Sequence, residues 1–365
     1  MNSKRVALFL SYLGGGGAER VMLNLAKGFL DSGLQVDLIL AKAWGPHLWK
    51  VPSGVTLVDL GASRPLLSLP NLVRYLGREQ PAALIAAMHY ANELAIVAKR
   101  LARVDTPIIV TEHNTLSRSL TRTKGMKQRL IPLAVRHLYP LADKVVAVSQ
   151  GARHDLEQLG RLSPDQLHAI YNPVITPDLE GKATEAVEHP WLQPGQWPVI
   201  LGVGKLEPQK DFPTLIRAFA QVRSHRPCRL AILGWGPGQE ALQALIDDLG
   251  IAADAALLGY VENPYAYMAR AQAFVLSSAW EGLPTVLIEA MALGLPVIST
   301  DCKSGPDEIL KGGQYGPLVP VGDSDAIAEA IDAVLDGNHP TVDQSWLEQF
   351  KLQGATQNYL KLFAH

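Results

Sequence analysis

The sequence predicts an α/β protein built from two doubly wound domains, and three observations support this fold class. The chain has 365 residues, 48% of them hydrophobic, which is enough for two substantial cores. Residues 6–40 read as a strand, a glycine loop, an amphipathic helix and a second strand, which is a βαβ unit. Residues 274–300 repeat the order of strand, loop, helix and strand in the second half of the chain.

The first βαβ unit consists of an apolar strand at 6–10, glycines at 14–17, a helix at 18–30 and a strand at 36–40. Glycines before a helix let the backbone approach an anionic ligand closely. A dinucleotide enzyme usually places an acidic residue at the end of the second strand, but here that strand ends in Leu40-Ala41-Lys42. This ending argues against an NAD-dependent enzyme.

Three further strands are expected at 83–87, 108–110 and 144–148, each followed by polar residues. Open parallel sheets bind their ligands beyond the carboxyl ends of the strands. His113 follows the second of these strands and is the stronger histidine candidate, whereas His89 follows the first and is weaker. The alternative for either histidine alone is a residue with only a structural role.

A basic segment follows His113 and contains no acidic residue between positions 118 and 136. Its cations alternate with apolar residues, which is typical of a segment that contacts an anionic bilayer. The alternative is a solvated loop and a helix packed by its apolar side. Nucleic acid is disfavoured, because the segment has no aromatic residue to stack on bases. The cations proposed to face the membrane are Arg118, Arg122, Lys124, Lys127 and Arg129.

Charge and composition limit the compartment and the chemistry. Residues 1–172 carry 21 Lys and Arg against 12 Asp and Glu, while the remainder carries 12 against 23, so the first half favours an anionic surface. Cys228 and Cys302 are the only cysteines, which predicts neither a disulfide framework nor a cysteine metal site. No run of about 20 apolar residues is present. We expect a cytoplasmic protein, peripheral on the inner face of the membrane.

The second domain is expected to place cations and carboxylates around one ligand. After a strand at 199–203, Lys205 and Lys210 lie in one loop, where two cations could neutralise a departing diphosphate without a metal. Glu281 lies in the loop after a strand at 274–276, and Glu289 lies in the helix that begins near Pro284. The plainer alternative is a set of ordinary surface lysines and glutamates.

Several of these motifs resemble those of the retaining glycosyltransferases of family 4, which have the two-domain GT-B fold. The signature is EGLPTVLIEAMALGLPVI, and GGGGAER, TEHNTLS and GVGKLEPQKDF resemble the glycine, histidine and basic loops of that family. The chain has Lys205 where arginine is frequent, which loses the bidentate geometry but keeps the charge.

The resemblance implies a role for each site residue. Lys205 and Lys210 would stabilise the leaving diphosphate, Glu289 would bind the ribose hydroxyls, Glu281 would contact the sugar, and His113 would position sugar or acceptor. No metal and no cofactor are required, because the nucleotide sugar is a substrate and the lysines supply the charge. The remaining donor-binding residues that it implies are Gly16, Gly17, Gly204, Gly234, Tyr260, Val261, Gly282, Leu283, Pro284 and Thr285.

Two other motifs have competing interpretations. Residues 301–306, which include Cys302, resemble bacterial members that transfer hexoses or acetamido sugars from UDP donors to lipid-linked glycans, so UDP is favoured over GDP. Cys302 itself is expected to be a packed small residue. Asp323-Ser324-Asp325 matches the Asp-x-Asp metal motif of the other large glycosyltransferase fold, but its place before an Ala-rich helix favours a helix cap.

The expected domains are an acceptor-side domain at 1–172, a donor-binding domain at 173–345 and a tail helix at 346–365 that returns to the first domain. The expected function is retaining, metal-independent transfer of a hexose or N-acetylhexosamine from a nucleotide diphosphate sugar to a glycan acceptor. We expect this acceptor to be lipid-linked and to serve surface polysaccharide or lipopolysaccharide biosynthesis. The alternatives are a nucleotide-sugar epimerase of the same fold and a non-catalytic nucleotide-sugar-binding subunit.

Overall fold

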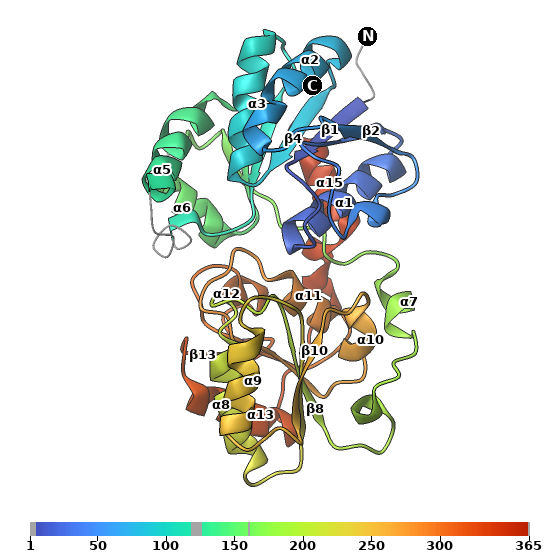
Figure 1. Cartoon of the computed structure of the whole chain (residues 1–365), viewed down its shortest axis with the longest axis vertical. Coiled ribbons are helices and arrows are strands. Elements are labelled where there is room, and N and C mark those ends of the chain that lie inside the picture. Colours follow the sequence, from blue (N-terminus) through green and yellow to red (C-terminus); the bar gives the residue numbers. More distant parts are fainter. Residues whose placement is uncertain (1–4, 118–125, 160, 364–365) are drawn as a thin grey trace. The chain divides into compact units, whose positions relative to one another are not determined.

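The computed structural model describes residues 5–117, 126–159 and 161–363, without the side chains of 126–130. It separates into two compact units (Figure 1). Unit 1 comprises Met1–Val174 together with Gln349–His365, and unit 2 comprises Ile175–Glu348. Each unit has its own parallel sheet.

The sheet of unit 1 has seven parallel strands in the order β3-β2-β1-β4-β5-β6-β7. The chain moves outward from β1 through β2 to β3. It then returns to β4, on the other side of β1, and moves outward again to β7. The point where the direction reverses therefore lies between β1 and β4, and ligands of doubly wound sheets bind at such points. The strands are β1 (Arg5–Leu10), β2 (Gln35–Leu40), β3 (Val55–Asp59), β4 (Ala83–Ala87), β5 (Ile108–Glu112), β6 (Lys144–Ala147) and β7 (Leu167–Ala169).

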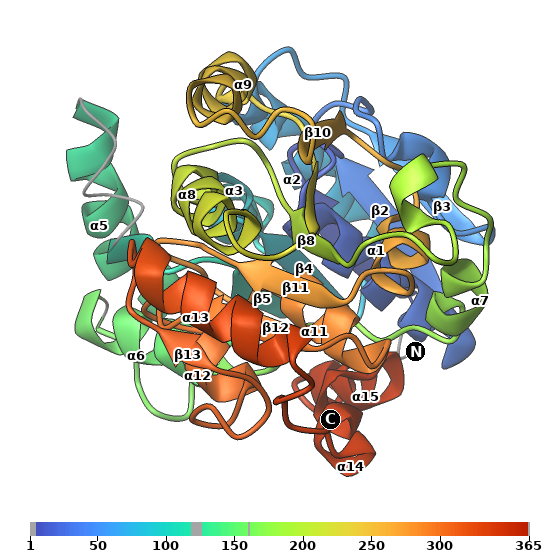
Figure 2. The same cartoon turned by 90° about the horizontal axis from the view of Figure 1, so that it is seen from below.

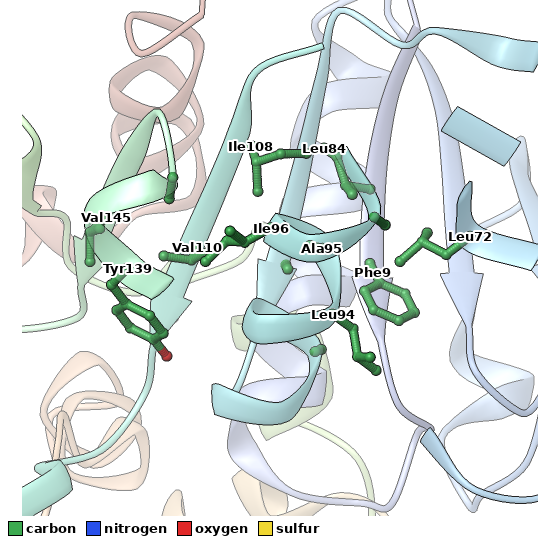
Figure 3. Close-up of a cluster of buried hydrophobic side chains, with 14 of the residues drawn as sticks. Phe9, Leu72, Leu84, Leu94, Ala95, Ile96, Ile108, Val110, Tyr139 and Val145 are labelled. Atoms are coloured by element: carbon green, nitrogen blue, oxygen red, sulfur yellow. The ribbon is translucent and has the colours of Figure 1, made fainter. Parts of the chain in front are cut away.

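Helices cover both faces of this sheet, so its central strands are apolar on both sides. On one face α15, red in Figure 1, packs against α1, and Val21, Met22, Leu25 and Phe29 of α1 enter the core at helical spacing. On the other face α3 packs its apolar residues against β1, β4 and β5 (Figure 3). The helices are α1 (Gly17–Asp31), η1 (Leu48–Lys50), η2 (Pro65–Ser68), α2 (Leu69–Glu79), α3 (His89–Ala102), α5 (Met126–Leu138), η3 (Tyr139–Leu141), α6 (Gln150–Leu159) and α15 (Leu352–Leu360).

The sheet of unit 2 has six parallel strands in the order β10-β9-β8-β11-β12-β13. Its direction reverses between β8 and β11, so the loops that follow these two strands begin next to each other. The strands are β8 (Val199–Val203), β9 (Arg229–Leu233), β10 (Ala255–Gly259), β11 (Ala273–Leu276), β12 (Val297–Thr300) and β13 (Leu318–Val319).

One face of the second sheet is covered by α8, α9 and α13, and Figure 2 shows α8 and α13 side by side. These helices bury their apolar residues with those of β8, β9, β11 and β12 in one core. The helices of this unit are α7 (Leu179–Ala183), η4 (Pro190–Leu192), α8 (Phe212–Arg223), α9 (Gln239–Asp248), α10 (Pro264–Met268), α11 (Thr285–Ala292), α12 (Pro306–Ile309), α13 (Ser324–Leu335) and α14 (Gln344–Leu347), and η5 (Glu348–Phe350) spans the border between the units.

The two doubly wound sheets confirm the predicted fold class. The tail begins differently from the expected single helix at 346–365. Trp346 lies in α14 of unit 2, where its indole nitrogen donates to the carbonyl of Ile309 at 2.9 Å and its ring lies 5.8 Å from that of Tyr315. These contacts hold Trp346 in unit 2, and the part of the tail that belongs to unit 1 starts at Gln349.

Among the described residues, no helix is both long enough and apolar enough to span a membrane. The basic segment falls largely outside the described part of the chain. Arg118, Arg122 and Lys124 lie in the first gap, and the side chains of Lys127 and Arg129 are also not described.

Candidate functional site

The centre of the candidate site is an ion pair between Lys210 and Glu281. The Lys210 ammonium lies 2.5 Å from Glu281 Oε1, and the two side chains are 18% and 7% exposed. Lys210 comes from the loop after β8, and Glu281 comes from the loop after β11. Because these strands flank the point where the sheet changes direction, the structure brings together two residues that are 71 positions apart.

Two further side chains fix the Glu281 carboxylate. The Ser278 hydroxyl donates to Oε1 at 2.7 Å, and the Gln209 amide nitrogen lies 3.4 Å from Oε2. The same Gln209 nitrogen donates to the carbonyl of Trp280 at 3.0 Å. A buried carboxylate held by a cation and by neutral donors keeps one orientation. The sequence patterns did not single out Ser278 or Gln209, although each stands within three residues of a predicted site residue.

Close backbone packing sets the position of the lysine loop. A Cβ on Gly234 would lie 1.8 Å from the carbonyl oxygen of Gly204, and its φ of +145° also favours glycine. A Cβ on Gly204 would in turn lie 3.1 Å from carbons of the Lys210 side chain. The loop after β9 therefore supports the loop after β8, and the alkyl chain of Lys210 crosses the bare backbone of Gly204.

Glu289 occupies the second turn of α11 and is 1% exposed. The Tyr265 hydroxyl lies 3.4 Å from Glu289 Oε1. Pro284 is the N-cap residue just before this helix, in an extended conformation with φ −70° and ψ 94°, and its side chain makes no capping hydrogen bond. Gly282 and Leu283 connect Glu281 to the cap, and Leu283 is buried, whereas Thr285 is the first helical residue.

The other predicted donor residues lie around the same edge of the sheet. The Lys205 side chain is exposed and forms no salt bridge or hydrogen bond within the described ranges. Tyr260 and Val261 directly follow β10, and the Tyr260 ring is 48% exposed. Cys302 is buried as expected, and burial raises the pKa of its thiol to about 12, so the thiol stays protonated at neutral pH.

His113 directly follows β5 in unit 1. Its Nε2 lies 3.1 Å from the Thr111 hydroxyl, which donates its own proton to the carbonyl of Ala86 at 2.9 Å. The histidine must therefore donate from Nε2 and keep a lone pair on Nδ1. Burial lowers the pKa of His113 to about 4, so the ring is neutral at physiological pH and serves as a hydrogen-bonding group, not as a cation.

The predicted glycines of unit 1 stand at the start of α1. Gly16 caps this helix and Gly17 is its first residue. A Cβ on Gly16 would lie 2.5 Å from a carboxylate oxygen of Glu19, so a carboxylate lies against this loop. Contact of Gly16 and Gly17 with the donor stays a prediction.

The described part of the chain contains no cluster of three or more His, Cys, Asp or Glu that could hold a metal ion. The Asp-x-Asp motif is a helix cap, because Asp323 Oδ1 accepts from the backbone nitrogens of Asp325 and Ala326 at 3.1 and 2.9 Å.

Comparison with known families identifies both halves of the chain. Residues 15–177 match the model described as Glycosyltransferase Family 4, and residues 184–348 match Glycosyl transferases group 1. A curated relative from Campylobacter jejuni is 30% identical over 347 residues, covering 91% of this chain and 90% of its own length. It is named N-acetylgalactosamine-N,N'-diacetylbacillosaminyl-diphospho-undecaprenol 4-alpha-N-acetylgalactosaminyltransferase. The chain belongs to glycosyltransferase family 4.

Other matches to this glycosyltransferase agree. The lipopolysaccharide core biosynthesis glycosyltransferase LpsE of Rhizobium meliloti is 30% identical and covers 96% of each chain. The structure of Anabaena Alr3699/HepE in complex with UDP and glucose superposes with a TM-score of 0.80 at 20% identity, over 98% of this chain and 99% of the other. The apo form of the lipopolysaccharide outer core galactosyltransferase WaaB gives 0.72 at 23% identity, over 99% of both chains. These structures establish the GT-B fold.

Beside His113, the glycosyltransferase contains a buried polar cluster that the sequence did not predict. Glu112 is 2% exposed, and its Oε1 accepts from the Asn92 amide at 2.9 Å and from the Tyr139 hydroxyl. The hydroxyl of Tyr139 can be seen in Figure 3 at the edge of the core. Burial raises the pKa of Glu112 to about 7, in spite of these two donors.

The Glu112→Gln variant should therefore lose part of the pH dependence of stability. In wild type the pKa is raised from 4.5 to about 7, so the unfolded chain releases this proton at a lower pH than the folded protein. The free energy of unfolding then falls by roughly 3 kcal/mol as the pH rises through this window. Glutamine keeps the acceptor oxygen but does not titrate. Urea denaturation at pH 5 and pH 8 measures the difference, and an unchanged pH slope in the variant would place the titration elsewhere.

Proposed function

We propose that this glycosyltransferase moves a hexose or N-acetylhexosamine from a nucleotide diphosphate sugar, with UDP favoured, to a lipid-linked glycan with retention at the anomeric carbon. The observation that carries the proposal is the buried Lys210–Glu281 pair at the point where the sheet of unit 2 changes direction. The names of the relatives add support, because one acts on a diphospho-undecaprenol-linked glycan and another serves lipopolysaccharide core biosynthesis.

Each site residue has a proposed role. Lys210 and the exposed Lys205 stabilise the negative charge that develops on the departing diphosphate, so no metal is needed. Glu289 binds the ribose hydroxyls, and Glu281 contacts the sugar while it holds Lys210 in place. The neutral His113 offers hydrogen bonds to the sugar or to the acceptor.

The proposed reaction takes place on one face of the sugar. The bond between the anomeric carbon and the diphosphate oxygen breaks, and the acceptor oxygen attaches to the same face. The acceptor proton passes to an oxygen of the departing diphosphate. No protein nucleophile is required, in keeping with the high pKa of the Cys302 thiol.

A panel of UDP and GDP sugars tests this proposal, with the product analysed by proton NMR in the presence of a chelator. Retention predicts the same anomeric configuration in donor and product, and turnover that EDTA leaves unchanged. An inverted product would contradict the same-face reaction, and loss of turnover with EDTA would contradict metal independence.

We also propose that the basic segment binds the anionic inner face of the cytoplasmic membrane, where a lipid-linked acceptor would lie. Each cation near such a surface contributes about 1 kcal/mol, so replacing Arg122, Lys124 and Lys127 by Gln should weaken vesicle binding by about 3 kcal/mol, or more than a hundredfold. High salt should have the same effect. Sedimentation with anionic and neutral vesicles is the measurement. Equal binding to both, or none to either, would show that the segment is an ordinary solvated surface.

A further inference from the structure

Unit 1 contains a hollow of about 330 Å³ that no predicted site residue lines. It lies beyond the carboxyl ends of β1, β2 and β3, within the range of volumes found for small-molecule sites. Its lining includes two aromatic rings and two cations but no carboxylate. The aromatic rings are those of Tyr12 and Trp44, and the cations are Lys42 and Arg64.

Backbone hydrogen bonds preform this hollow. The nitrogen of Lys42 donates to the carbonyl of Ser11 at 3.1 Å, and the nitrogen of Leu13 donates to the carbonyl of Trp44 at 3.0 Å. A Cβ on Gly45 would lie 2.0 Å from the Leu13 carbonyl oxygen, and its φ is +125°, so only glycine allows the two loops to approach this closely. The loops after β1 and β2 therefore fix the backbone that carries the two aromatic residues.

The aromatic rings suit a sugar. Tyr12 and Trp44 meet edge to face with their centroids 6.0 Å apart, yet Trp44 remains 58% exposed. The face of an aromatic ring carries partial negative charge, and the C–H groups on one side of a sugar ring carry partial positive charge. An exposed tryptophan beside two cations is thus a platform on which a sugar ring can stack.

The cations suit a phosphate or diphosphate. Neither Lys42 nor Arg64 forms a salt bridge or a hydrogen bond through its side chain within the described ranges. The arginine fork matches phosphate oxygens in a bidentate manner, and lysine adds a second positive charge. With no carboxylate in the lining, both charges remain available to an anion.

The next two residues along the chain are apolar and exposed. Leu66 is 69% exposed and Leu67 is 58% exposed, and both directly follow Arg64 and Pro65 of the hollow. Exposed leucines next to a cationic site match a ligand in which a hydrocarbon chain is attached to the phosphate. The hollow and the residues next to it in the chain thus combine aromatic, cationic and apolar groups.

We propose that this hollow binds the acceptor as a prenyl diphosphate glycan. In this assignment a sugar ring stacks on Trp44, the diphosphate contacts Lys42 and Arg64, and the start of the lipid lies on Leu66 and Leu67. The assignment rests on the proposed transfer to a lipid-linked glycan and adds the residues that recognise the link. A nucleotide also combines a flat ring with phosphates, but the proposed residues for ribose and diphosphate all lie in unit 2.

The test is calorimetric titration with a probe, farnesyl diphosphate carrying one N-acetylgalactosamine, and separately with UDP. The double variant Lys42→Gln/Arg64→Gln should bind the probe on the order of 10²-fold more weakly, because each lost charge-assisted contact costs at least about tenfold. Trp44→Ala should lower the affinity for the probe by roughly tenfold. Inorganic diphosphate and the methyl glycoside of N-acetylgalactosamine serve as separate arms, and each should bind more weakly than the complete probe.

Arg78→Gln is the matched control, because its side chain is 83% exposed on α2 and away from the hollow lining. This control should bind the probe as wild type does, and all variants should keep wild-type affinity for UDP. Probe affinity that is unchanged in the double variant, or no probe binding in wild type, would overturn the assignment. A loss of UDP affinity in the double variant would also overturn it, by assigning the hollow to the donor. If wild type binds the probe but not UDP, the proposed donor is refuted, whereas the assignment of the hollow to the acceptor stands.

Discussion

Replacing Lys210 by alanine is expected to lower turnover by roughly 10²-fold or more, comparable with the loss of one preorganised donor to a developing negative charge. The substitution removes the cation that lies 2.5 Å from Glu281 and that we propose stabilises the departing diphosphate. Steady-state nucleotide release measures the turnover of this variant. Lys182→Ala is a suitable control, since Lys182 forms an exposed ion pair with Asp178 in the same unit.

The Lys210→Ala variant also leaves Glu281 in a buried position without its cation, which can destabilise the fold. The double variant Lys210→Met/Glu281→Gln removes both charges and keeps similar volumes. It should recover the thermal stability of wild type but not its turnover. Turnover close to wild type in either variant would remove Lys210 from the mechanism.

The second large effect separates the two carboxylates. If Glu289 binds ribose, Glu289→Gln should weaken the binding of both free UDP and the intact donor. The expected loss of affinity is about tenfold to a hundredfold, the usual value of a hydrogen bond to a charged group. Glu281→Gln should bind UDP nearly normally and lose turnover with the sugar attached. Glutamine keeps the shape of each side chain, so the comparison isolates the charge.

Calorimetry with UDP decides between these assignments. Both glutamates lie in unit 2, Glu281 before Pro284 in the chain and Glu289 after it in α11. Each variant is therefore an internal control for the other. Unchanged UDP affinity in the Glu289 variant would refute its contact with ribose. Equal losses in both variants would show that the carboxylates act on the same part of the ligand.

The strands and the placement of the two site carboxylates could be predicted from the sequence, because they depend on local patterns. The expected strands at 83–87 and 199–203 coincide with β4 and β8, since each is a short apolar run between polar turns. The expected helix at 18–30 is α1 with one more residue at each end. The motif around Glu281 placed one carboxylate in a loop and the other in a helix, as the structure has them.

What the sequence did not predict depends on contacts between distant segments. The pairing of Lys210 with Glu281 follows from the strand order, which places β11 beside β8. The cluster of Asn92, Glu112 and Tyr139 joins three segments that no single pattern connects. The hollow beside Trp44 forms where the loops after three strands meet, and the glycine motif in the first of these loops does not indicate it.

The most direct measurement of the central claim is the stoichiometry of nucleotide release and sugar transfer. Wild-type protein is incubated with a UDP-hexose or UDP-N-acetylhexosamine and a prenyl diphosphate glycan, and both products are quantified by mass spectrometry. We expect one UDP to be released for each sugar added to the glycan, with little release when the acceptor is omitted. Free sugar or an isomeric nucleotide sugar formed without acceptor, or no release from any donor, would contradict it.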